Sequence, residues 1–246
     1  MDVEKSRFQA LDHWFDSIQG IEIASAFGKE IDAFKDFMHG DILLQLGSAG
    51  DSPWLDKLRY RYKWQLSPNR NDKNTVLSSC NQMALNRNSV DAIISPLSMS
   101  AFNHHKNPID EIDRVLKPGG FAVFFGINPF SFWGLFLKMK KFSCFGEHKG
   151  NSMSFLFVKR AMQHRGYHCC HASHFYYLPP VLTKQGLEKL EVLNEIGKMV
   201  SLIPAGFYCL VFQKQELRPS LTAENLQEHY NRAHVLQPLC RTSSKS

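Results

Sequence analysis

From residue 41 onward, short apolar runs alternate with amphipathic segments, and this alternation restricts the fold more than any other feature of the sequence. The expected strands are 41–47, 60–66, 91–95, 121–127, 167–178 and 207–216. The expected helices are 52–58, 99–116, 151–165 and 183–200. Parallel neighbouring strands need crossover connections, which are usually helical. The pattern therefore predicts an α/β fold with a mostly parallel sheet and helices on both faces.

The residues before this pattern are expected to form an N-terminal helical cap over 1–40. Phe8, Leu11, Phe15 and Ile18 follow helical spacing, and a break is expected at Gly20. The α/β domain is expected over 41–217. The residues 218–246 then form a C-terminal extension that is partly disordered, because its last residues are uniformly polar.

Composition narrows the functional classes. The 246 residues are 43% hydrophobic and 21% charged, which excludes a disordered or fibrous chain. The N-terminus has no signal-peptide pattern, and six cysteines without CxxC spacing favour reduced thiols in a cytoplasm and no metal site. Residues 1–40 carry eight acids and four bases, a net charge of −4, so the rest of the chain carries +10 and the whole chain +6. This charge suits an anionic partner or an ordinary solvated surface, and no motif supports nucleic-acid binding.

The most specific motif is RVLKPGG, residues 114–120. Its first residues finish an apolar helix face, Pro118 stops the helix, and the two glycines permit the turn into the next buried strand. The segment 91–135, with Asp91, Glu111 and Arg114 in register, resembles the class I S-adenosylmethionine-dependent methyltransferases, in particular the small bacterial type 11 proteins. The resemblance extends more weakly over 41–213. It implies a Rossmann-like, seven-stranded sheet whose last strand is antiparallel.

The resemblance implies an S-adenosylmethionine site at the carboxyl ends of the strands. In the first loop, Gln45 replaces an acid, Gly47 keeps the first glycine, and Ala49 and Asp51 replace the second and third. A side chain at 51 is expected to intrude on the methionine end of the cofactor. At the end of the second strand, Gln65 replaces an acid. In the loop after the third strand, Ser79 replaces another. The residues expected to bind the cofactor are Gln45, Gly47, Ser48, Gly50, Gln65, Ser79, Ser95, Pro96 and Leu97.

Loss of three charged acceptors leaves two functions open. The first is methyl transfer to a small, apolar or aromatic acceptor, for which positioning supplies much of the catalysis. The second is a methyltransferase-like interaction module that no longer binds the cofactor. His104 and His105 precede the helix with Glu111 and are candidates for a catalytic base, or a surface pair at a helix start.

Two further clusters of residues are candidates for a functional role. His168, His171 and His174 fall on an expected strand, where His171 faces away from the other two, so they are not expected to bind one metal. The segment 128–145 combines six aromatic residues with three lysines. It is interpreted as the wall of an acceptor pocket, as a peripheral membrane contact through 130–141, or as ordinary packing.

Overall fold

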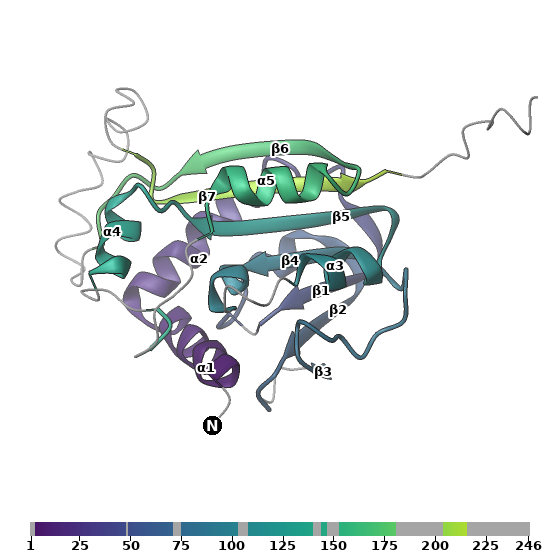
Figure 1. Ribbon diagram of the computed structural model, residues 1–246, viewed down its shortest axis with the longest axis horizontal. Coiled ribbons are helices and arrows are strands. Elements are labelled where there is room, and N and C mark those ends of the chain that lie inside the picture. Colours follow the sequence, from purple (N-terminus) through teal and green to yellow (C-terminus); the bar gives the residue numbers. More distant parts are fainter. Residues whose placement is uncertain are drawn as a thin grey trace, which may run out of the picture. The chain divides into compact units, whose positions relative to one another are not determined.

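A computed structural model of the chain describes residues 3–47, 49–70, 75–102, 108–139, 144–146, 153–180 and 204–215. All of them belong to one compact unit, Met1–Gln215. Its centre is a seven-stranded sheet of order β3-β2-β1-β4-β5-β7-β6 (Figure 1). The strands are β1 (His39–Leu46), β2 (Arg59–Ser67), β3 (Val76–Leu77), β4 (Val90–Pro96), β5 (Leu116–Ile127), β6 (Tyr167–Phe175) and β7 (Phe207–Lys214).

The strand directions agree with the resemblance. β1 is parallel to β2 and β4, and β4 is parallel to β5. β7 lies between β5 and β6 and is antiparallel to both. The expected α/β class, the mostly parallel sheet and the antiparallel last strand are therefore confirmed. The carboxyl ends of β1, β2, β4 and β5 share one edge of the sheet.

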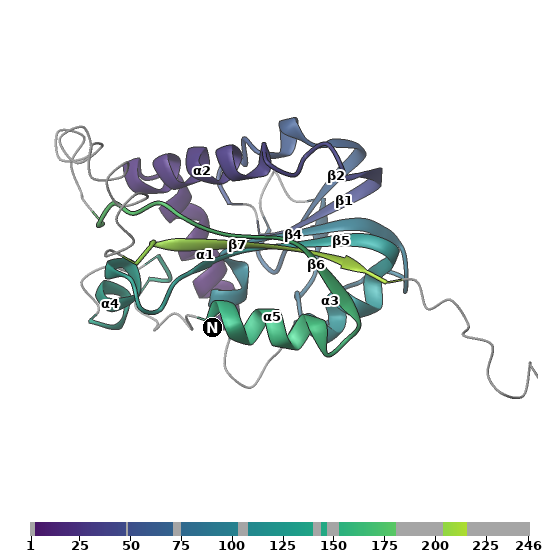
Figure 2. The same ribbon diagram turned by 90° about the horizontal axis from the view of Figure 1, so that it is seen from above.

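Helices cover both faces of the sheet. They are α1 (Val3–Phe15), α2 (Ile18–Ile31), α3 (Ile109–Val115), α4 (Phe132–Lys138), α5 (Phe155–Gln163) and the 3-10 helices η1 (Leu55–Lys57) and η2 (Ser98–Ala101). Figure 2 shows α2 on one face and α3 and α5 on the other. The ring of Phe27 in α2 stacks on Phe125 of β5 with centroids 4.2 Å apart, which ties α2 to the buried centre of the sheet.

The expected helix break at Gly20 is wrong. The chain turns at Asp16, and Ser17 caps α2 by accepting a hydrogen bond from the Gly20 amide at 3.1 Å. Gly20 lies inside the first turn of α2. A Cβ there would lie 2.1 Å from the carbonyl oxygen of Trp14, so the glycine permits close contact between the two helices.

Three expected helices are shorter than predicted. Within 52–58 only η1 forms, because Ser52 has a φ of 45° and its side chain is bonded inside the preceding loop. Within 99–116 the described residues form η2 and α3, and β5 begins at Leu116. The helix expected from 151 begins at Phe155 with Ser154 as its cap. The helix expected over 183–200 and the extension 218–246 lie outside the described residues.

None of the helices in the described part of the chain is both long enough and apolar enough to span a membrane.

Candidate functional site

The loop after β1 begins at Gly47, at the shared edge of the sheet. Gly47 has a φ of 85°, and its amide donates to the carbonyl oxygen of Leu66 in β2 at 2.7 Å. Ala49, Gly50 and Ser52 also have positive φ, which gives a sharp turn typical of backbone that approaches a ligand. Positive φ angles favour glycine at these four positions, although Ala49 and Ser52 are not glycines.

The buried side chain of Gln45 holds this loop by hydrogen bonds. Its side chain is fully buried, and Nε2 donates to the Gly47 carbonyl at 3.0 Å and to the Ser52 hydroxyl at 2.7 Å. Its Oε1 accepts from the indole nitrogen of Trp54 at 2.9 Å. These groups occupy both ends of the amide, so Gln45 supports the turn from within the protein. Its expected contact with a cofactor stays a prediction.

Helix α1 lies across the same edge. A Cβ built on Gly47 would lie 3.3 Å from Cε1 of Phe8, so the phenyl ring lies directly against the glycine. The ring is fully buried and forms an edge contact with Phe102, with centroids 5.5 Å apart. Farther along α1, Asp12 accepts a hydrogen bond from the Ala49 amide at 3.2 Å. Phe8, rather than Asp51, is the side chain that covers the glycine.

Glu4 brings a carboxylate to the loop after β3. Its two oxygens accept from the Ser79 hydroxyl at 3.0 Å and from the Asn81 side-chain amide at 3.3 Å. The residue is only 6% exposed. Burial, with a smaller effect of the Glu4 charge, raises the pKa of the Cys80 thiol well above its ordinary value. Glu4 cannot be identified from the sequence, because the helical spacing of α1 shows which face is apolar but not where the helix docks.

Three buried oxygen atoms at this edge have no hydrogen-bond partner among the described residues. They are Oε1 of Gln65 in β2, Oδ1 of Asn81 and Oγ of Ser95 in β4. Ser95 is fully buried. A buried oxygen without a partner is costly, so these positions suit a ligand that carries hydrogen-bond donors. Two of the three, Gln65 and Ser95, are among the expected cofactor-binding residues.

The end of β4 is also a tight turn. Leu97 has a φ of 59°, and its amide donates to the carbonyl oxygen of Phe125 at 3.0 Å. The neighbouring Ser98 hydroxyl donates to the carbonyl of Leu46, which joins the ends of β1 and β4. Pro96 is the last residue of β4. The predicted residues Ser95, Pro96 and Leu97 are thus brought next to the Gly47 turn.

Glu111 and Arg114 support the loop that carries Asn81. Arg114 donates to the carbonyl oxygens of Leu85 and Met83, each at 2.9 Å, and pairs with Glu111 at 2.9 Å. Glu111 in turn accepts from the Met83 amide at 3.1 Å. Hydrogen bonding by Arg114, with a smaller contribution from Met83, lowers the pKa of Glu111. Glu111 and Arg114, both in the resembling segment, therefore hold this loop in place.

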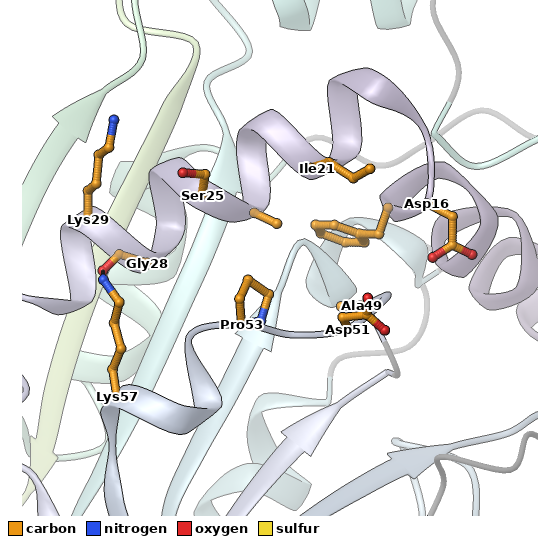
Figure 3. A pocket seen from close by; sticks show the side chains of 11 residues that line it. Asp16, Ile21, Ser25, Gly28, Lys29, Ala49, Asp51, Pro53 and Lys57 are labelled. Atoms are coloured by element: carbon orange, nitrogen blue, oxygen red, sulfur yellow. Dashed lines mark hydrogen bonds between the residues drawn. The ribbon is translucent and has the colours of Figure 1, made fainter.

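A cavity of about 680 Å³ lies beside the Gly47 turn, between α2 and the segment that carries η1. Apolar walls are provided by Phe15, Ile21, Ala24 and Pro53. Figure 3 shows the carboxylates of Asp16 and Asp51 at one end of the cavity, and Lys29 and Lys57 at the other. Such a volume is typical of a small-molecule site. Asp51 is exposed and borders this cavity.

The remaining residues singled out from the sequence either lie outside the described residues or lie on β6. Ser48, His104 and His105 lie outside the described residues. His171 packs against Phe34, and His174 packs against Phe155 of α5, so these two histidines face opposite sides of the sheet as expected. Among the described residues, no group of three or more histidine, cysteine, aspartate or glutamate side chains could hold a metal ion.

The segment from 128 divides into a buried and an exposed part. Trp133 is buried and donates its indole N–H to the Leu178 carbonyl at 2.7 Å. Phe130, Phe132, Leu135 and Met139 are exposed, and none of them lines the cavity beside Gly47. Packing is therefore confirmed for Trp133, and the exposed residues require a separate explanation.

Comparison with known proteins agrees with this geometry. Residues 56–124 match the family model for the methyltransferase domain. A comparison with curated proteins gives no match. Among solved structures, a Haloferax volcanii methyltransferase in complex with the Trm112 activator is 15% identical with a TM-score of 0.57, and the alignment covers 84% of this chain and 98% of that one.

Two further structures have the same fold. A Thermotoga maritima S-adenosylmethionine-dependent methyltransferase is 15% identical with a TM-score of 0.55, covering 83% of this chain and 99% of that one. An Archaeoglobus fulgidus S-adenosylmethionine-dependent methyltransferase is 12% identical with a TM-score of 0.53, covering 78% and 94%. Residues 56–124 are thus similar to a methyltransferase domain, and the described part of the chain has the fold of these S-adenosylmethionine-dependent methyltransferases.

Proposed function

We propose that the chain transfers a methyl group from S-adenosylmethionine to a small apolar or aromatic acceptor, and that α1 covers the cofactor groove until the cofactor enters. The observation that carries this proposal is the set of partnerless buried oxygens on Gln65, Asn81 and Ser95. A nucleoside offers hydroxyl and amino donors that would satisfy such oxygens. A location in the cytoplasm of a bacterial cell is part of the same proposal.

The residues at the Gly47 turn have the chemistry to bind the cofactor once α1 has moved away from it. Gly47 leaves bare backbone at the turn, and Gln65 and Ser95 offer neutral acceptors on either side of it. The ring of Phe8 occupies the space against Gly47. A hinge is available at Asp16, which lies between the end of α1 at Phe15 and Ser17, the cap of α2. When bound, the cofactor supplies an electrophilic methyl group on its sulfonium.

The acceptor class is supported by the cavity beside the turn. Its volume suits a small molecule, and the rings of Phe15 and Pro53, with Ile21 and Ala24, make its walls largely apolar. The chain's task in this reaction is to hold the acceptor in line with the methyl group, because alignment lowers the barrier to a displacement. His104 and His105 stay the candidates for a base where the acceptor carries a proton.

Calorimetric titration with S-adenosylhomocysteine tests the proposal on the full chain. Binding is expected, and Gln65→Asp is expected to tighten it about tenfold because a charged acceptor forms stronger hydrogen bonds. The matched control is Gln163→Asp on the exposed end of α5, which should leave the affinity unchanged. Absence of heat and of a thermal shift at millimolar ligand overturns the proposal.

A second candidate is an interaction module whose groove is permanently filled by α1. The contacts of Glu4 and Phe8 favour it, because both side chains are buried where the resemblance places the cofactor. This candidate predicts no binding of S-adenosylhomocysteine by the wild-type chain or by Gln65→Asp. The titration therefore separates the two functions.

A further inference from the structure

We infer that the exposed face of α4 is a contact surface for an anionic lipid bilayer. The α4 face is defined here as Phe130, Phe132, Leu135 and Met139, which are 82%, 45%, 48% and 51% exposed. Phe132, Leu135 and Met139 are spaced by three and four residues, so they lie on one side of the helix. Large apolar side chains gathered on one exposed face commonly mark an interaction site.

The protein core holds this face in place. Trp133 is buried, donates to the Leu178 carbonyl and contacts the ring of Phe207 with centroids 5.0 Å apart. Ser131 caps the helix by accepting from the Gly134 amide at 3.2 Å. Asn128 accepts from the Phe130 amide at 3.1 Å. The contacts on the inner side of α4 thus anchor the helix to the protein. The apolar residues on its outer side are not needed for this anchoring.

The charge around α4 suits an anionic surface. Lys138 is exposed at the end of the helix, and Lys140 and Lys141 follow directly in the sequence. From 114 to 146 the sequence contains no aspartate or glutamate. Aromatic and aliphatic residues next to lysines are typical of segments that lie in the interface of an anionic membrane.

A second copy of the chain fits this face less well. An interface that repeats the same patch on both subunits would bring Lys138 of one copy close to Lys138 of the other. The seven residues of α4 also offer less area than the roughly 800 Å² per partner of a stable interface. A bilayer has no such lower limit, because each apolar side chain inserts independently and acidic lipid headgroups match the lysines.

A membrane contact at α4 would also place the proposed methyltransferase site near the bilayer. This one consequence rests on the proposed function. α4 begins at Phe132, shortly after β5 ends at Ile127 on the edge that carries the Gly47 turn. Binding of the α4 face would bring that edge close to the membrane. An apolar acceptor dissolved in the lipid would then be near the site.

Co-sedimentation of the full chain with vesicles tests the inference without any measurement of activity. Vesicles of phosphatidylglycerol and phosphatidylcholine are expected to bind the chain at least tenfold more tightly than pure phosphatidylcholine vesicles. The double variant Phe130→Ser, Phe132→Ser is expected to lose at least tenfold in affinity for the anionic vesicles. Lys138→Gln should weaken binding to anionic vesicles and leave the weak binding to phosphatidylcholine unchanged.

Leu77→Ser is the matched control, because Leu77 is 61% exposed on β3, the outermost strand of the sheet, which β2, β1 and β4 separate from β5. It should bind like the wild type, and an unchanged melting temperature should show that each variant is folded. Equal binding by the double variant and the wild type overturns the inference, as does no binding to anionic vesicles. A dimer in sedimentation equilibrium that the double variant abolishes also overturns it, in favour of a second copy.

Discussion

The carboxylate of Glu4 accepts a hydrogen bond from the hydroxyl of Ser79 at 3.0 Å, which joins the first turn of α1 to the loop after β3. The resemblance to class I methyltransferases implies an acid at the position of Ser79, where it would contact the cofactor. Here the position is a serine, and the acid comes from another part of the chain. α1 and the cofactor would therefore compete for the same loop.

A double-mutant cycle measures this contact. Glu4→Ala is expected to lower the free energy of unfolding by about 1 to 2 kcal/mol, because it leaves the half-buried donors of Ser79 and Asn81 without their acceptor. The coupling with Ser79→Ala should be about 1 kcal/mol in urea titrations. Asp56→Ala, at an exposed site, should change stability by less than about 0.5 kcal/mol. Zero coupling would contradict the contact.

Restoring the family acid beneath the turn is expected to destabilise the protein. In Gln45→Glu one carboxylate oxygen would face the carbonyl of Gly47, where Nε2 now donates, inside a fully buried site. The loss should be about 2 to 4 kcal/mol at pH 7. Burial would raise the pKa of the new carboxyl, so the loss of stability relative to the wild type should be smallest at low pH and should grow as pH rises toward the folded-state pKa.

Chemical denaturation between pH 4 and pH 8 checks this prediction. Gln9→Glu, on the exposed side of α1, is the control and should show no comparable loss. A Gln45→Glu protein as stable at pH 8 as the wild type would contradict the role assigned to the amide.

The fold follows from local sequence patterns to a large extent. Continuous apolar runs predict β1 and β4 closely, but β5 begins at Leu116 and not at the expected residue 121. The turn expected from the RVLKPGG segment is an irregularity inside β5, where Gly119 has a φ of 78° and the pairing with β4 shifts register. Such runs are reliable because a buried parallel strand needs apolar residues on both faces. The Gly20 error has the opposite cause. The spacing of residues does not show that a glycine is needed for contact with another helix.

The site is predicted less completely for a physical reason. Gln65 and Ser95 are identified because they end strands at the ligand-binding edge. Glu4 and Phe8 are not, because their contacts join residues about 75 and 39 positions apart in the chain. Local patterns carry no information on such a docking. The exposure of the α4 face is likewise a tertiary property, since its aromatic residues resemble core residues in the sequence.

Asp91 predicts an acid-dependent loss of stability. Its carboxylate pairs with Lys117 at 2.7 Å and accepts from the amides of Ile42 and Asp41 at 2.9 and 3.1 Å. Burial acts to raise the pKa of Asp91, but Lys117 and the two amides together outweigh it and lower the pKa. The stabilisation is therefore present above the unfolded pKa of about 4 and is lost as pH falls through the folded value.

Asp91→Asn should be about 1 to 2 kcal/mol less stable than the wild type at pH 7. The difference should shrink below about pH 4, where the wild-type carboxylate also becomes protonated. Denaturation curves from pH 2 to pH 7 measure it, with Asp56→Asn as the exposed control. A difference that stays constant with pH would contradict the charge-dependent role.

Arg114 is expected to be irreplaceable by lysine. A lysine keeps the charge, but its single nitrogen cannot bond the carbonyls of Met83 and Leu85 together with Glu111 in one plane. Arg114→Lys should cost about 1 to 2 kcal/mol and accelerate hydrogen exchange at the Met83 amide. Arg87→Lys, on the exposed part of the same loop, should do neither. Unchanged exchange at Met83 would contradict the assignment.

The affinity for S-adenosylhomocysteine of Phe8→Leu relative to Phe34→Leu tests the covering role of α1 most directly. Both phenylalanines are buried, but only Phe8 lies against Gly47. If α1 must leave the groove, weakening its docking by about 1 kcal/mol should raise the apparent affinity about fivefold for Phe8→Leu, and Phe34→Leu should match the wild type. An affinity that is equal in both variants, or lower in Phe8→Leu, would contradict the account.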